Sequence, residues 1–194
     1  MKKFFFLICL SLFSQIAYSQ WIWQNPLPQG NTLTSICFID ANTGFAIGQF
    51  GTVLKTYDSG GTWTILRSGT TNKLLALSFV NKSIGYAVGE KGTIIKTVDS
   101  GSTWTILQSG TNRVLNSVYF TDSVTGYVAG GSNYNGGIIL KTIDGGISWS
   151  ILLNDIYDCF FRAVYFTNRN IGYTLGDNGT ILKTEDKGAT WIYL

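Results

Sequence analysis

The sequence predicts an all-β fold made of one antiparallel unit repeated four times. The chain of 194 residues contains 23 glycines but only 2 prolines, and 14% of its residues are aromatic. This composition is typical of short strands joined by tight turns. No stretch carries a sustained helical apolar period, so we expect no helix. A motif that recurs along the chain defines the repeated unit.

The motif is an octet with the pattern T-x-D-x-G-x-x-W, whose four tryptophans are spaced by 41, 45 and 42 residues. We expect its aspartate to accept backbone N–H groups in a turn between the third and fourth strands of a unit. The glycine should adopt a positive φ, and the tryptophan should pack into the sheet. Equivalent positions in four units cannot converge on one substrate, so we interpret the octets as structural rather than catalytic or metal-binding. Their defining residues are Asp58, Gly60 and Trp63; Asp99, Gly101 and Trp104; Asp144, Gly146 and Trp149; and Asp186, Gly188 and Trp191.

Each unit also repeats an apolar run that ends in Phe, a Gly-aromatic step and an apolar segment that ends in Lys-Thr. In the first unit these features predict strands at about 33–39, 44–48, 52–56 and 63–67. Four antiparallel strands in every forty-odd residues make one blade of a β-propeller. The expected blades span about 33–68, 74–109, 115–153 and 161–194. We interpret the four repeated lysines as structural; they are Lys55, Lys96, Lys141 and Lys183.

A stray strand at 21–24 precedes the first blade and looks like the fourth strand of a preceding one. In a closed propeller such a strand completes the last blade, but Trp191 to Leu194 already begin that strand. Because the two ends compete for one place, we predict an open or partial propeller. Blade faces are apolar and need neighbours, so we expect the arc either to be part of a longer propeller or to self-associate through its exposed terminal blades.

The octet resembles the Asp box of BNR repeats, which occur in sialidases and other secreted propellers. The fuller unit, with Gly-Tyr-Ala-Val-Gly at 85–89 and Gly-Thr-Ile-Ile-Lys-Thr at 92–97, resembles the photosystem II stability/assembly factor-like repeat. The opening at 23–30 is similar to the start of exported bacterial members of that group. The resemblance covers nearly all of the chain after residue 19. It implies a propeller, and the family's name is not carried over as an activity.

The N-terminus has the pattern of a secretory signal peptide over residues 1–19. Lys2 and Lys3 precede a short apolar run at 4–13, and the small residues Ala17 and Ser19 flank a cleavage point after Ser19. We therefore expect residues 20–194 to be secreted, periplasmic or on the cell surface, without a transmembrane segment after the signal is removed. An exported protein could pair the remaining Cys37 and Cys159, but their spacing favours two free thiols.

The composition excludes several function classes. The chain has no histidine, which excludes His-based triads and His metal sites. Loss of Lys2 and Lys3 lowers the net charge from +3 to +1, so no basic patch suits nucleic acid. No phosphate loop or metal cluster is present in the sequence, and we expect no cofactor and no metal site.

The third unit departs from the repeat in two places. It carries four extra residues within Gly131 to Gly137, and the segment 154–162 replaces a plainer crossover to the fourth unit. In a propeller, second-to-third-strand loops and blade crossovers emerge on one face, here called the loop face; the octets emerge on the other, the octet face. Aromatic and amide side chains suit protein or glycan surfaces. The alternative is a tolerated loop insertion. The candidate binding residues are Asn133, Tyr134, Asn135, Asp155, Tyr157, Asp158 and Arg162.

These features predict an exported, non-enzymatic β-propeller that acts as a binding or assembly scaffold through its loop face, with a protein or a glycan as partner. A purely structural role is a further possibility. The alternative is a fragment of a glycan-active hydrolase. Sialidases similar to this family use three arginines, and only Arg113 and Arg162 are expected on the loop face. Asp158 and Asp177 make the best carboxylate pair for another glycosidase.

Overall fold

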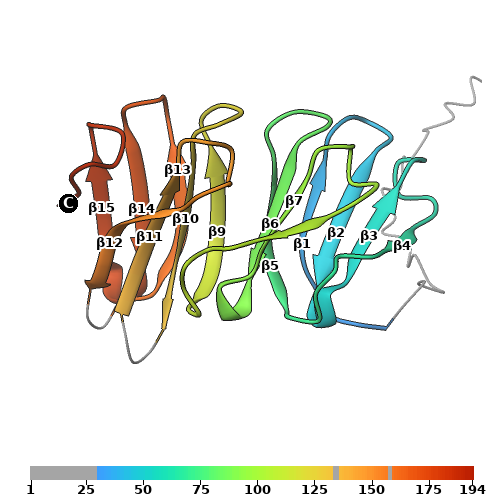
Figure 1. Ribbon diagram of the computed structural model, residues 1–194, viewed down its shortest axis with the longest axis horizontal. Coiled ribbons are helices and arrows are strands. Elements are labelled where there is room, and N and C mark those ends of the chain that lie inside the picture. Colours follow the sequence, from blue (N-terminus) through green and yellow to red (C-terminus); the bar gives the residue numbers. More distant parts are fainter. Residues whose placement is uncertain (1–29, 133–135, 157–158) are drawn as a thin grey trace, which may run out of the picture.

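The computed structural model describes residues 30–132, 136–156 and 159–194, which form four antiparallel sheets of four strands each (Figure 1). Blade 1 contains β1 (Leu33–Phe38), β2 (Gly44–Gly48), β3 (Val53–Thr56) and β4 (Thr64–Leu66). Blade 2 contains β5 (Leu74–Phe79), β6 (Gly85–Gly89), β7 (Ile94–Thr97) and β8 (Thr105–Leu107). Blade 3 contains β9 (Val114–Phe120), β10 (Gly126–Ser132), β11 (Gly136–Thr142) and β12 (Ser150–Ile156). Blade 4 contains β13 (Phe161–Phe166), β14 (Gly172–Gly176), β15 (Ile181–Thr184) and β16 (Ile192–Tyr193).

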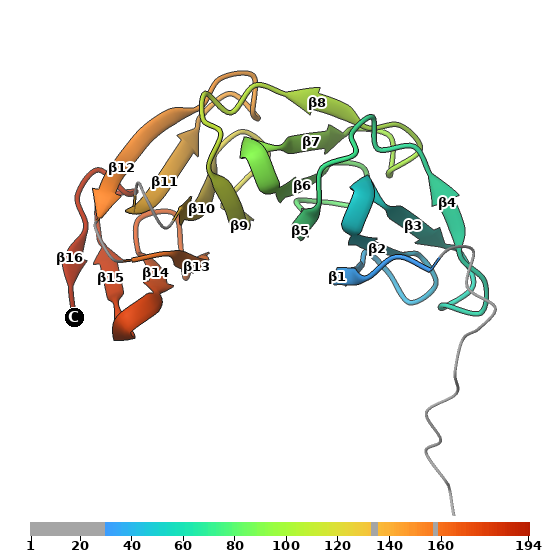
Figure 2. The same cartoon turned by 90° about the horizontal axis from the view of Figure 1, so that it is seen from below.

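The blades follow an open arc, with the first strand of each sheet on its concave side and the fourth on its convex side (Figure 2). The prediction of an all-β, open or partial propeller is confirmed. Within the described ranges the only helical elements are single 3-10 turns, η1 (Gln49–Gly51), η2 (Glu90–Gly92) and η3 (Asp177–Gly179). No helix there is long and apolar enough to cross a membrane. The expected signal peptide and the stray strand at 21–24 lie outside the described residues.

Blade 3 differs from the other blades because its insertion lengthens strands. The extra residues were expected in a loop, but Gly131 and Ser132 continue β10 and pair with Gly137 and Gly136 of β11. Strand β12 also reaches Ile156 and pairs it with Gly137, so part of the unusual crossover is strand as well. The hairpin can extend because ladder hydrogen bonds satisfy its backbone, whichever side chains it carries. Blade 3 therefore projects further on the loop face than its neighbours.

The core lies between blades, where the second and third strands of one blade pack on the first strand of the next. Between blades 2 and 3, Tyr86, Val88 and Ile94 pack against Leu115 and Phe120, all buried. The rings of Tyr86 and Phe120 stack with centroids 3.9 Å apart. Burying side chains of this size contributes about 1.5–3 kcal/mol each. Most of the stability of the arc therefore depends on each blade having a neighbour.

The Gly-aromatic step has a steric cause. Gly126 begins β10 opposite Phe120, and a Cβ at Gly126 would lie 2.5 Å from the Phe120 ring. Gly85 and Phe79 stand in the same relation in blade 2, with 2.6 Å. Only glycine leaves room for the ring against the backbone, which explains why this step recurs in every unit.

Polar side chains join neighbouring blades at the edge of this core. Tyr86 Oη and Lys96 Nζ of blade 2 both donate to the carbonyl of Gly145 in the octet turn of blade 3, at 2.8 and 2.7 Å. Tyr127 Oη and Lys141 Nζ donate in the same way to the Lys187 carbonyl of blade 4. In blade 1, Lys55 Nζ donates to the Ser100 carbonyl of blade 2. Each lysine in these three contacts therefore ties its own blade to the next one.

The tyrosine hydroxyl in this contact is a permanent donor at neutral pH. Burial, and secondarily the charge of Asp144, raises the pKa of Tyr86 to about 12. Burial also raises the pKa of Tyr127 to about 12. Both hydroxyls thus remain protonated well above physiological pH, and the contact does not depend on pH in that range.

We expect Tyr86→Phe to lower the free energy of unfolding by about 1 kcal/mol, because it removes one buried hydrogen bond while Lys96 still satisfies the Gly145 carbonyl. Urea titration of both proteins measures this difference. Tyr193→Phe changes an exposed ring and serves as the control. Equal midpoints for Tyr86→Phe and the unchanged chain would contradict the role assigned to this contact.

Candidate binding face

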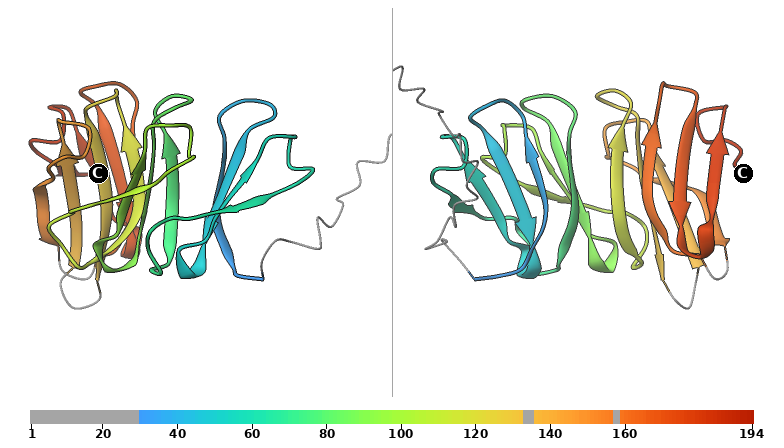
Figure 3. Two further views of the ribbon diagram at one scale, coloured as in Figure 1. Left: turned by 45° about the vertical axis from the view of Figure 1, so that its right-hand side comes forward. Right: turned by 180° about the vertical axis from the view of Figure 1, so that it is seen from behind.

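The two ends of the blades carry different turns (Figure 3). The octet turns and the first-to-second-strand turns lie at one end, on the octet face. The turns η1, η2 and η3 and the blade crossovers lie at the other end, on the loop face. Successive strands of an antiparallel blade run in opposite directions, so successive turns lie at alternate ends of the blade. The two faces therefore present different sets of side chains.

In each octet, the aspartate is bonded within its own turn. In blade 2, the backbone N and Oγ1 of Thr103 donate to the Asp99 carboxylate at 2.9 and 2.7 Å. The hydroxyl of Thr97 donates to the same carboxylate at 2.8 Å and accepts from the backbone N of Gly101. The equivalent hydroxyl-carboxylate contacts recur at Asp58, Asp144 and Asp186.

The octet glycine and tryptophan belong to the contact between blades. Gly101 has φ +75°, and the ring of Phe45 from blade 1 occupies the space that a side chain would need. Trp104 is 8% exposed and meets the rings of Phe45 and Phe79 edge-on. The residue before the glycine also has a positive φ, 57° at Ser100. This second left-handed residue turns the carbonyl of Ser100 toward Lys55, a feature that the octet pattern alone did not indicate.

The octet carboxylates are held ionised. Hydrogen bonds from the side chain and then the backbone of Ser148 lower the pKa of Asp144 to about 2. The corresponding threonines lower the pKa values of Asp99 and Asp186 to about 2 as well. A group with so low a pKa is a poor proton donor at neutral pH, and these oxygens are already engaged. The geometry therefore supports a structural role for the octets.

We expect these carboxylates to make stability depend on pH in the acid range. Their pKa in the folded chain is below the value of about 3.9 in an unfolded chain, so their contribution is present above pH 4 and lost as the pH falls towards 2. Asp144→Ala should lower the melting temperature at pH 7 by a few degrees and show a smaller further decrease at acid pH.

Thermal unfolding followed by circular dichroism from pH 7 to pH 2 checks this expectation. Glu90→Ala removes an acidic group from the loop face and is the matched control. If Asp144→Ala and Glu90→Ala had the same melting temperature at pH 7, the structural account of the octet would be wrong.

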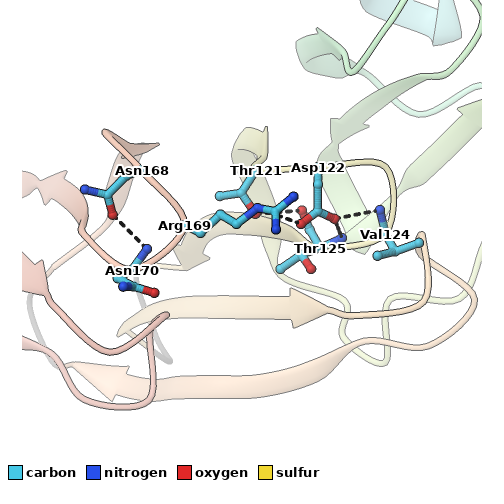
Figure 4. Close-up of polar contacts among 7 residues, drawn as sticks. All are labelled: Thr121, Asp122, Val124, Thr125, Asn168, Arg169 and Asn170. Atoms are coloured by element: carbon cyan, nitrogen blue, oxygen red, sulfur yellow. Dashed lines mark hydrogen bonds and ion pairs between the residues drawn. The ribbon is translucent and has the colours of Figure 1, made fainter.

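The turns between the first and second strands of each blade also lie on the octet face, and their polar side chains make hydrogen bonds and ion pairs (Figure 4). Asp122 accepts the backbone N–H groups of Val124 and Thr125 at 3.0 and 2.8 Å. Arg169 of blade 4 approaches Asp122 of blade 3, with Nε 3.7 Å from the carboxylate. Lys82 and Asp40 link blades 2 and 1 in the same way at 3.4 Å. These ion pairs join the adjacent turns of neighbouring blades.

On the loop face, the structure describes only part of the predicted binding patch. Asn133, Tyr134, Asn135, Tyr157 and Asp158 lie outside the described residues. Asp155 belongs to β12, and its side chain is likewise outside the described part.

Arg162 is described and is already paired. It lies in β13, exposed, and its Nε and Nη2 donate to the two carboxylate oxygens of Asp177 at 2.8 and 3.2 Å. The Phe160 ring lies beneath the guanidinium, 5.1 Å from Cζ to the centroid. Asp177, one member of the carboxylate pair considered for hydrolysis, is thus held in a bidentate ion pair.

Two adjacent hollows lie on the loop face beside a smaller one, and none of the three was predicted from the sequence. The blade 2 hollow, of about 700 Å³, is lined by Lys91, Ser109 and Arg113 with Ile106 and Ile151. The blade 1 hollow, of about 670 Å³, is lined by Phe50, Ile65 and Arg67. Both include Thr70 and Asn72 of the crossover from blade 1 to blade 2, so they form one run across three blades.

The repeated isoleucines give this run its apolar wall. Ile65, Ile106 and Ile151 occupy the same position in the outer strands β4, β8 and β12, and each is about half exposed. The signal in the sequence was the Thr/Ser-Ile-Leu that follows the octet tryptophan in the first three units, where the alternation of the strand turns the isoleucine outward. Hydroxyl, amide and cationic groups lie beside this wall. No group of three or more His, Cys, Asp or Glu side chains that could hold a metal ion occurs in the described part of the chain.

Comparison with known proteins supports the propeller assignment. The family model described as photosynthesis system II assembly factor YCF48 matches residues 62–156. A structure of YCF48 bound to D1 peptide has a TM-score of 0.55 at 17% identity, covering 86% of this chain and 83% of that one. YCF48 from Cyanidioschyzon merolae has a TM-score of 0.66 at 17% identity, covering 79% and 51%. An ancestral GH74 enzyme has a TM-score of 0.70 at 20% identity, covering 88% and 25%. No curated protein matches the sequence significantly.

At these identities the solved structures show a common fold. The chain spans about half the length of the Cyanidioschyzon merolae protein and a quarter of the GH74 enzyme. Together with the octets, these matches support a β-propeller built of BNR-like repeats.

Proposed function

We propose that this chain is an exported, non-catalytic propeller scaffold whose loop face binds an extended segment of a partner protein. The observation that carries the proposal is the run of two hollows with its isoleucine wall. A binding groove of this kind combines apolar anchors with a few polar groups that fix orientation. Here Ile65, Ile106 and Ile151 supply the anchors.

A polypeptide fits this surface well. The hollows pass from blade to blade over the crossovers, so they are elongated, and a peptide backbone can pair with their hydroxyl and amide groups. The isoleucines recur once per blade, so they offer apolar contacts on three successive blades to a segment long enough to reach across them. A YCF48 protein of the same fold has been solved with a D1 peptide, which supports a peptide as the kind of ligand.

The non-catalytic part of the proposal is supported by the state of the carboxylates. The octet aspartates are bonded within their turns, and Asp177 is paired with Arg162. Glu90 and Asp177 begin equivalent turns on blades 2 and 4, with a whole blade between them. A glycosidase needs two carboxylates facing one bond.

The alternative is a glycan-active hydrolase fragment, and the likeness to a GH74 enzyme is the observation that favours it. That alternative places the catalytic pair at Asp158 and Asp177, of which Asp158 lies outside the described residues. Export rests on the signal peptide pattern of residues 1–19 and gives the scaffold an extracytoplasmic setting.

We expect the purified chain to bind members of an array of short peptides, and Ile106→Ser to weaken that binding about tenfold, since an anchor side chain contributes on the order of 1.4 kcal/mol. Ile147→Ser makes the same change at an exposed position of the octet face and should leave binding unchanged.

A parallel glycan array with a hydrolysis assay separates the two candidates. Cleavage of glycans would favour the hydrolase alternative, and binding of glycans without cleavage and without any peptide bound would overturn the proposal of a peptide ligand. Equal loss of peptide binding in both isoleucine variants would place the ligand elsewhere than in the hollows.

A further inference from the structure

The two ends of the arc carry the two halves of the contact that joins neighbouring blades. That contact occurs three times inside the chain. One half comes from the second and third strands of a blade: an aromatic ring, two aliphatic side chains and the lysine. The other half comes from the next blade. Its first strand supplies a leucine or phenylalanine, an aliphatic side chain and a final Phe, and its octet turn supplies the carbonyl that accepts the lysine.

Blade 4 presents the first half without a described neighbour. Leu175 and Ile181 occupy the positions that Val88 and Ile94 occupy in blade 2, where both are fully buried. Leu175 is instead 48% exposed and Ile181 is exposed as well. Tyr165, on the same side of the sheet, is also exposed.

The polar part of this half is present too. Tyr173 and Lys183 stand opposite each other in β14 and β15, as Tyr127 and Lys141 do in blade 3. Lys141 donates to the octet turn of the next blade. Lys183 is partly buried and pairs with the exposed Glu185 of its own blade. Its position in the sheet matches that of Lys141, so its amine would exchange Glu185 for the octet carbonyl of a following blade.

Blade 1 presents the other half. Leu33, Ile36 and Phe38 are exposed in β1, and Ile36 is 62% exposed. At the same positions of blade 3, Leu115 and Val118 are buried. In the octet turn of blade 1, Ser59 has φ 59°, like Ser100 with φ 57° in blade 2. The Ser59 carbonyl thus corresponds to the Ser100 carbonyl, which accepts from the lysine of the preceding blade.

We propose that two copies of this chain associate head to tail, with blade 4 of each copy packed on blade 1 of the other. A second copy fits each free face, because the two faces complement each other. Blade 4 offers the aliphatic side chains and the tyrosine and lysine donors, and blade 1 offers the apolar first strand and the carbonyl acceptor, as neighbouring blades do within the chain. Both ends of the arc open toward the same side (Figure 2), so two arcs facing each other meet at both ends and close a ring. A heterologous contact that closes in this way limits the assembly to two copies.

The experiment measures the mass of the purified chain by light scattering coupled to size-exclusion chromatography. We expect twice the mass of one chain, without larger species as concentration rises. Ile36→Glu and Leu175→Glu each place a charge in one half of the contact, at positions exposed within a single copy, and each should run with the mass of one chain. Ile147→Glu on the octet face should keep the mass of two copies.

Mixing the two blocked variants tests the head-to-tail arrangement. Each retains one intact half, so an equimolar mixture should recover a species of two copies that neither variant forms alone. If Ile36→Glu alone kept two copies, blade 4 would pair with blade 4 and the proposal would fail. The mass of one unmodified chain, or a mass that grows without limit, would also overturn it.

Circular dichroism and cooperative unfolding confirm that each variant is folded. Lys183→Met, which keeps the aliphatic stem, provides a milder second variant and should raise the dissociation constant about tenfold, as loss of a charge-assisted hydrogen bond does. The peptide-binding proposal is tested independently, because Ile106→Ser lies in the hollows and should leave the mass at two copies.

Discussion

The carbonyl group inside each octet turn is the point on which the arrangement of blades depends. Two consecutive residues with positive φ, such as Ser100 and Gly101, turn this carbonyl toward the preceding blade. There it accepts a lysine amine and, in blades 3 and 4, a tyrosine hydroxyl also. The octet aspartate holds the turn in shape from within, through bonds that keep its carboxylate ionised. The repeated features of each unit thus serve one contact, made once per pair of neighbouring blades.

This contact engages the octet side chains, so they are poorly placed to bind a ligand as well. Octet side chains are occupied by the turn and by the neighbouring blade, and the inner turns are joined by ion pairs such as Arg169 with Asp122. The loop face differs more from blade to blade, because its hollows have different linings and blade 3 carries a longer hairpin there. In the proposed function, the partner therefore binds at the end of the strands opposite the octet turns.

Much of the fold could be predicted because the unit is repeated. Four octets in register identified the turn, and the alternation around Gly85-Tyr86 gave the strands that flank it. The extended hairpin of blade 3 could not be predicted, because Gly131 and Gly137 read as a loop until backbone pairing across β10 and β11 is seen. The hollows depend on how three blades fan apart, which no single repeat encodes. Of the predicted binding residues, Arg162 proved to be paired with Asp177 through the β14–β15 turn, a contact that sequence spacing did not reveal.

Each octet turn in blades 2 to 4 is held by the blade before it. Hydrogen–deuterium exchange of a chain carrying both Tyr127→Phe and Lys141→Met tests this dependence, because both donors to the Lys187 carbonyl are removed. We expect faster exchange at 184–190, in the octet turn of blade 4, and unchanged exchange at 97–103, in the octet turn of blade 2. Unchanged exchange at 184–190, or an equal increase in both turns, would contradict it.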